Sequence, residues 1–150
     1  MNIRPLLLGL FFGTFLSSHA DAESVKNFPF NVRYLSGDWV ESYDDSAACA
    51  KSNLHIRMEI SKDRKRFHVL LDRMWKNDMG TTSDNAWATI LSATDRTLVI
   101  RYDNETRLRK SGEPVEWELS VVAPGVYRWR ETSWPVGEVN TIVGLRCSAS

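Results

Sequence analysis

The chain has 150 residues, with 19 basic and 19 acidic side chains and therefore no net charge at neutral pH. This balance argues against a nucleic-acid-binding protein and against a polybasic protein of the membrane surface, since both need an excess of basic residues. The length fits one domain that buries roughly two-thirds of the surface of its unfolded chain.

Residues 1–22 have the organisation of a secretory signal peptide. Arg4 gives a positive start, the apolar run LLLGLFFGTFL follows, and Ala20 and Ala22 precede the expected cleavage before Glu23. The run is shorter than the ~20 residues that a spanning helix needs, although a retained membrane anchor is the alternative interpretation. We therefore expect residues 23–150 to form one domain in the periplasm or outside the cell, with no retained membrane span.

Cys49 and Cys147 are the two cysteines of the sequence. In an oxidising compartment they most simply form one disulfide, with two free buried thiols as the alternative. The bridge would close a loop of about 100 residues, for which chain entropy gives an upper figure of ~4–5 kcal/mol of stabilisation. A redox role is not indicated, because the cysteines do not form a Cys-x-x-Cys pair.

Alternation of apolar and polar residues, the period of half-buried β-strands, dominates the mature sequence. In LHIRMEI the apolar side chains share one face, while His55, Arg57 and Glu59 share the other. Residues 78–85, DMGTTSDN, read as a loop. In chain order, the expected strands are residues 38–42, 54–60, 67–71, 87–91, 97–103, 115–121, 126–132 and 139–147.

These short strands and connections predict an all-β fold. A consecutive antiparallel meander of eight strands closes naturally into an eight-stranded up-and-down barrel, because closure removes the unpaired edges. An open sandwich is the alternative architecture.

The stretch LSGDW, residues 35–39, opens the first expected strand, and Arg146 ends the last one. Together with the eight-strand meander, these residues resemble the lipocalin-like (calycin) barrels. The resemblance implies that Gly37 forms a corner, that Trp39 lies across the closed end of the barrel, and that Arg146 packs on this indole in a cation–π contact of ~0.5–2 kcal/mol. The disulfide would then tie the loop after the first strand to the last strand.

The same LSGDW stretch followed by Cys49 is also similar to the small periplasmic metallopeptidase inhibitors of bacteria, which are barrels of this size with one disulfide. In that family a short N-terminal segment plugs a peptidase active site. The resemblance implies that residues 23–34 form such a segment here.

Tryptophan is frequent in this chain, with six residues. Trp87, Trp117, Tyr127 and Trp129 fall on expected strands, where they would either fill the barrel or line a cavity for one apolar or aromatic ligand. Arg73 follows the parity of the apolar side chains before it, so it would pair with an anionic head group at the mouth, unless a bulge reverses the parity. We predict these five residues as ligand contacts.

No catalytic motif is evident, since the sequence carries no phosphate-binding Gly-rich loop and no Gly-x-Ser-x-Gly. His55 and His68 fall on the polar faces of adjacent strands, where they would hold a metal ion with Glu59 or else be solvated side chains. We adopt the second interpretation and expect no enzyme activity, no cofactor and no metal ion.

The sequence therefore predicts an exported, monomeric barrel that binds a partner without catalysis. The first hypothesis is a lipocalin-like carrier or sensor of a small apolar or amphipathic ligand. The second is a protein-binding module that inhibits a peptidase or another secreted hydrolase. It would use residues 23–34 or the loops that carry Trp75 and Trp134.

Overall fold

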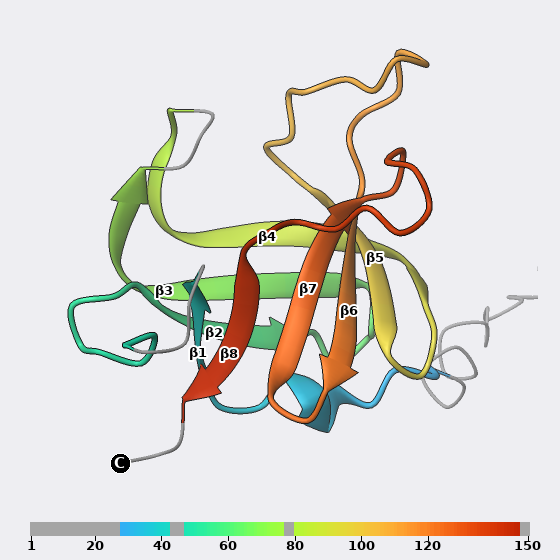
Figure 1. Cartoon of the computed structure of the whole chain (residues 1–150). Helices are drawn as coiled ribbons and strands as arrows, with labels where there is room; N and C mark the ends of the chain where they lie inside the picture. The colour runs from blue at the N-terminus through green and yellow to red at the C-terminus, as the bar shows by residue number, and fades with distance from the viewer. Residues whose placement is uncertain (1–27, 43–46, 77–79, 148–150) are drawn as a thin grey trace, which may run out of the picture.

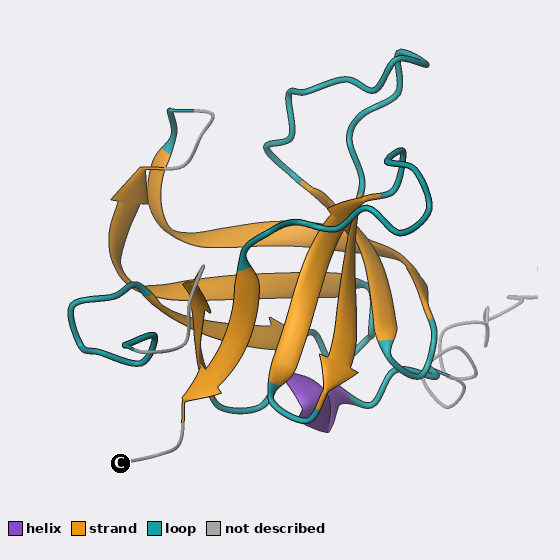
Figure 2. Ribbon diagram, viewed as in Figure 1, coloured by secondary structure: helices purple, strands orange, loops and turns teal. Residues whose placement is uncertain are grey.

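The computed structural model describes residues 28–42, 47–76 and 80–147, so the predicted signal peptide lies outside the described residues. The described residues form a 3-10 turn, η1 (Val32–Leu35), and eight strands (Figures 1 and 2). Over the same ranges, no helix has the length and apolar character needed to cross a membrane. The strands are β1 (Asp38–Ser42), β2 (His55–Ile60), β3 (Arg66–Lys76), β4 (Thr82–Ala93), β5 (Thr97–Tyr102), β6 (Trp117–Ala123), β7 (Val126–Glu131) and β8 (Val143–Cys147).

Each strand pairs antiparallel with the next strand in the sequence, and β1 pairs with β8, so the sheet is a closed up-and-down barrel. The closing ladder runs without a register shift from the pair Asp38↔Cys147 to the pair Ser42↔Val143. The predicted barrel is confirmed, and the sandwich is excluded. Closure gives each of the described strands a neighbour on both sides within the barrel.

The hairpin of β3 and β4 is longer than predicted. Strand β3 continues to Lys76 and β4 begins at Thr82, where we expected a loop over residues 78–85. The pair Trp75↔Ser83 extends the ladder beyond a register shift that follows Leu70. Most side chains in this extension are exposed, so the sequence shows no clear alternation there. Figure 1 shows the extension projecting beyond the barrel wall.

Strand β8 is shorter than predicted and begins at Val143 rather than at residue 139. The backbone N–H of Asn140 donates to the carbonyl of Trp129 at 2.8 Å, and its side-chain oxygen accepts from the N–H of Ile142 at 3.0 Å. These bonds hold the preceding residues in a loop instead of in the β7–β8 ladder.

The turn η1 covers one end of the barrel (Figure 2). There Trp39 is fully buried, and its indole N–H donates to the carbonyl of Leu35 at 3.0 Å. The guanidinium of Arg146 lies 4.8 Å from the Trp39 ring centroid and donates to the carbonyl of Tyr34. Gly37 makes the corner with a φ of 112°, a value that favours glycine. This closed end has the arrangement that the lipocalin-like resemblance implies.

The disulfide between Cys49 and Cys147 joins the β1–β2 loop to the end of β8, as predicted. Near Cys147, the Nδ1 of His55 lies 2.5 Å from the carboxylate of Asp38, and Nε2 lies 3.2 Å from the carbonyl of Ala50. The hydrogen bond to Asp38, followed by the one to Ala50, raises the pKa of His55 above its ordinary value. The protonated imidazole can donate to both acceptors at once.

Because the pKa of His55 is higher in the folded state, protonation stabilises the fold at acidic pH, and this contribution is lost as the pH rises through the folded-state pKa. We expect His55→Gln to lower the free energy of unfolding by about 0.5–1 kcal/mol at pH ~5, and by less at pH ~9. Urea unfolding of the oxidised protein at both pH values measures this difference. An equal loss at both would contradict the assignment.

Candidate functional site

The barrel is packed at the end covered by η1 and hollow toward the other end. Trp39, Phe67, Leu98 and Leu119 are fully buried and fill the covered end. Toward the opposite end lies a cavity of about 320 Å³, whose lining includes residues of the β5–β6 and β7–β8 loops. This volume falls near the lower limit of the ~300–1,000 Å³ that is usual for small-molecule sites. The sequence left open a filled or a hollow barrel, and the structure combines both.

Strands β2, β3 and β4 give the cavity its apolar side. Ile56 and Met58 of β2 lie directly opposite Leu71 and Val69 of β3. Ala86 of β4 is paired with Val69 and carries only a methyl group, which leaves room on this side. The alternation of β2 puts these apolar side chains inside because successive side chains of a strand point to opposite faces.

Three of the five predicted ligand contacts, Trp117, Tyr127 and Trp129, line the cavity. The rings of Tyr127 and Trp129 are 6.0 Å apart, and Tyr127 also packs at 5.0 Å on Trp39 of the closed end. Tyr127 thus lies between the packed end and the cavity. Its ring crosses β8 at Gly144, where an added Cβ would lie 2.1 Å from the ring.

Trp87, the fourth predicted contact, lies outside the cavity. Its indole stacks on the imidazole of His68 with 3.8 Å between ring centroids, and the residue is 42% exposed. The flanking residues Ala86 and Ala88 occupy the inward positions of β4, so strand parity directs Trp87 outward.

Arg73, the fifth predicted contact, is also absent from the cavity lining. Its guanidinium pairs with the carboxylate of Asp72 and donates to the backbone carbonyls of Lys51 and Asn53. It therefore holds the β1–β2 loop, whose carbonyls accept from its N–H groups. The register shift after Leu70 corresponds to the bulge that the sequence analysis gave as the alternative interpretation for Arg73.

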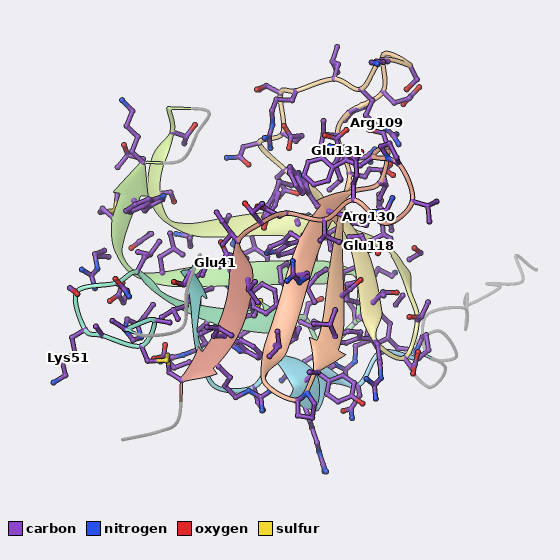
Figure 3. The ribbon with its side chains drawn as sticks, in the orientation of Figure 1. Glu41, Lys51, Arg109, Glu118, Arg130 and Glu131 are labelled. Atoms are coloured by element: carbon purple, nitrogen blue, oxygen red, sulfur yellow. A yellow bond between two sulfur atoms is a disulfide. The ribbon has the colours of Figure 1, made fainter. Side chains whose placement is uncertain are left out.

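Glu41 is an exposed acidic side chain that lines the cavity, and the sequence analysis did not identify it as a contact. Its Oε1 accepts hydrogen bonds from the Tyr127 hydroxyl and from the Trp129 indole, each at 2.9 Å. Figure 3 labels Glu41 on β1. It has the same strand parity as the inward Trp39, a signal in the sequence that could have identified it. Burial, followed by the charge of Glu41, raises the pKa of Tyr127, so its hydroxyl remains a donor.

At the mouth of the cavity, Glu105 binds Arg107 and Trp117. The Arg107 guanidinium donates to both oxygens of Glu105 at 2.8 and 2.7 Å, and the Trp117 indole donates at 3.2 Å. Burial alone would raise the pKa of Glu105, but the hydrogen bonds from Arg107 and Trp117 outweigh it and leave the pKa below its ordinary value. The positive charge of Arg107 is thereby balanced, and the indole of Trp117 is fixed in the cavity wall.

The two histidines considered as metal ligands do not come together. His68 is paired with Glu59 across the β2–β3 ladder, whereas His55 binds Asp38. The ligand atoms of Asp38, His55 and Cys147 lie within 4.8 Å of one another, but the sulfur of Cys147 is bonded to Cys49. This group therefore lacks the thiolate that would bind a metal ion.

Exposed apolar side chains occur at the strand end and on two loops around the open end of the barrel. Met74 and Trp75 lie near the end of β3, and Leu108, Val136 and Val139 lie in the β5–β6 and β7–β8 loops. The prediction of a loop at Trp75 was wrong, because β3 continues to Lys76, and Trp75 also lines the cavity. Val136 is 98% exposed and Leu108 65% exposed. Single exposed apolar side chains are common on protein surfaces, whereas a group of them at one end of a protein is typical of a contact surface.

Comparison with protein-family models, with curated proteins and with solved structures finds no significant match to this chain. The likeness to lipocalin-like barrels accordingly rests on architecture: a closed antiparallel up-and-down barrel with Arg146 over Trp39 at one end. The function has to be argued from the cavity itself.

The close approach of Tyr127 to Gly144 predicts a large effect of a single methyl group. Gly144→Ala should lower the free energy of unfolding by about 3 kcal/mol, the upper part of the usual range for overpacking, because the new Cβ would overlap the ring. In a Tyr127→Ala background the same substitution should cost much less, and urea unfolding of the four proteins measures this coupling. Equal costs in both backgrounds would show that the ring does not lie across Gly144.

Proposed function

We propose that the protein is an exported carrier or sensor that binds one small apolar or amphipathic molecule in the cavity of its barrel. The main support is the unfilled space behind Trp117, Tyr127 and Trp129, next to a fully packed end of the same barrel. A chain that only had to fold would gain stability by filling this space with larger side chains, for example in place of Ala86.

The lining has the composition of a binding site rather than of a catalytic centre. Apolar and aromatic side chains predominate, and a few polar groups stand at fixed positions among them, as in most small-molecule sites. Glu41 and Glu105 are both engaged by indole or hydroxyl donors, which orient the carboxylates. Burial of an apolar ligand would contribute roughly 25 cal/mol for each Å² of apolar surface removed from water.

The experiment is a titration of the oxidised mature protein with decanol and with an apolar fluorescent dye, followed by indole fluorescence. We expect saturation near one equivalent. Replacing Trp117 and Trp129 together by leucine should remove most of the signal change, whereas Trp87→Leu, a matched change on the outer face, should leave it intact.

A blocking variant separates binding in the cavity from binding at the surface. Ala86→Phe puts a ring into the cavity and should abolish binding without unfolding the barrel. A flat titration of the wild-type protein, or binding that Ala86→Phe leaves unchanged, would contradict the proposal.

The second candidate, a protein-binding inhibitor, is favoured by the exposed apolar side chains around the open end. The described part of the predicted N-terminal segment does not extend freely, because Phe30 is 3% exposed and Phe28 packs against the core. Residues 23–27 lie outside the described residues. Inhibition of a zinc metallopeptidase that is weakened by Val136→Ser, and not by Val122→Ser on the barrel wall, would favour this candidate.

A further inference from the structure

We infer that the cavity prefers ligands with a positively charged amine or ammonium group, which the carboxylate of Glu41 binds, over ligands of equal length with a neutral or anionic head group. This inference rests on the proposed function and specifies the chemistry of its ligand. It reverses the sequence-based expectation of an anionic head group at Arg73.

Glu41 and Arg107 of the cavity lining, counted together with Glu105, the partner of Arg107, leave one negative charge in excess. The lining includes Glu41 and Arg107. The guanidinium of Arg107 donates to both carboxylate oxygens of Glu105, whose side chain is only 1% exposed. The ion pairs found among the described residues do not include Glu41. A cationic ligand would therefore neutralise the remaining charge.

The hydrogen bonds of Glu41 orient its carboxylate and still leave it able to accept from a ligand. The hydroxyl of Tyr127 and the indole of Trp129 both donate to Oε1, and neither donates to Oε2. These donors are neutral, so they fix the position of the carboxylate but do not cancel its charge. An ammonium group could donate to Oε2 in a charge-assisted hydrogen bond, one of the stronger kinds found in proteins.

The aromatic side chains around Glu41 favour a cation as well. Trp129 and Tyr102 line the cavity, and the faces of such rings attract ammonium groups. The ring of Trp117 already carries the guanidinium of Arg107, 5.2 Å from its centroid. Glu41 also lies close enough to two tyrosines to affect their ionisation. Burial is the larger cause that raises the pKa of Tyr102 and of Tyr127, and the negative charge of Glu41 is the next. A carboxylate beside several aromatic faces is a suitable environment for an amine with an apolar tail.

Among the lining residues that the structure describes, an anionic head group has no comparable partner. Asn104 and Asn140, the other polar residues of the lining, are neutral amides. Arg73 is bound to Asp72 and to the β1–β2 loop. A carboxylate ligand would thus meet the charge of Glu41, while Arg107, the cation of the described lining, is already paired with Glu105.

The test compares four ligands with the same decyl chain: decylamine, decyltrimethylammonium, decanol and decanoate. Calorimetric titration near neutral pH should show that the two cations bind about tenfold more tightly than decanol, which is the effect of a modest charged hydrogen bond or ion pair. Decanoate should bind more weakly than decanol.

Glu41→Gln is the decisive variant, because its amide oxygen can still accept from Tyr127 and Trp129 while the charge is removed. In this variant decylamine should bind no more tightly than decanol. Glu59→Gln removes the same charge from the outer face of β2 and should preserve the tenfold preference. Near-ultraviolet circular dichroism checks that the aromatic cluster is intact in both variants.

The outcomes separate this inference from the proposed function. Equal binding of all four ligands, or a preference that Glu41→Gln leaves unchanged, would overturn the inference and leave the proposed function standing. Tighter binding of decanoate would overturn it too. Failure of every ligand to bind the wild-type protein would overturn the proposed function, and the inference with it.

Discussion

The pairing of β1 with β8 is the constraint on which the rest of the structure depends. Its register puts Trp39 opposite Arg146, and Glu41 opposite Gly144 two residues further along. The first pair builds the closed end. The second leaves a gap in the wall of side chains, through which the ring of Tyr127 reaches the carboxylate of Glu41. A slip of one residue would turn both pairs to the outer face, so a single register determines the closed end and the cavity wall.

Packing changes along the barrel axis, and this change links the fold to the proposed function. Near η1 large side chains fill the interior, and Leu98 and Leu119 lie side by side there across the β5–β6 ladder. Toward the mouth, the aromatic side chains are tied to the wall by hydrogen bonds from Trp117 to Glu105 and from Trp129 to Glu41. These bonds hold the indoles against the wall and keep the central space open. The disulfide and the contact of Arg146 with Trp39 secure closure near the packed end, where no ligand needs to pass.

Much of the fold could be predicted from the sequence, because alternation records which face of a strand is buried. The strand order follows from local patterns and the disulfide from the two cysteines, whereas the closed end at Gly37, Trp39 and Arg146 was implied by the resemblance to lipocalin-like barrels. The extension of the β3–β4 hairpin could not be predicted, since its side chains are exposed and carry no alternation.

The cavity was harder to predict, because its chemistry depends on register between distant strands. Glu41 meets Tyr127 across a separation of 86 residues, and no local pattern indicates that contact. The outward direction of Trp87 follows from the inward alanines beside it, whose small size gave no signal of burial. Arg73 forms an ion pair with Asp72 and donates to carbonyls of the β1–β2 loop. The course of that loop could not be predicted from the sequence. The sequence thus identified Trp117, Tyr127 and Trp129 as lining residues, whereas Glu41 and the misplacement of Trp87 and Arg73 became evident only from the three-dimensional pairing.

The central claim is that a ligand enters the barrel, and the methionines offer the most direct measurement of it. Met58 is 5% exposed and lines the cavity, whereas Met74 is 60% exposed at the end of β3. With methyl-labelled methionine and decylamine, the account predicts nuclear Overhauser effects between the decyl chain and the Met58 methyl group, and none to Met74. Contacts to Met74 alone, with the Met58 signal unchanged at saturation, would contradict it.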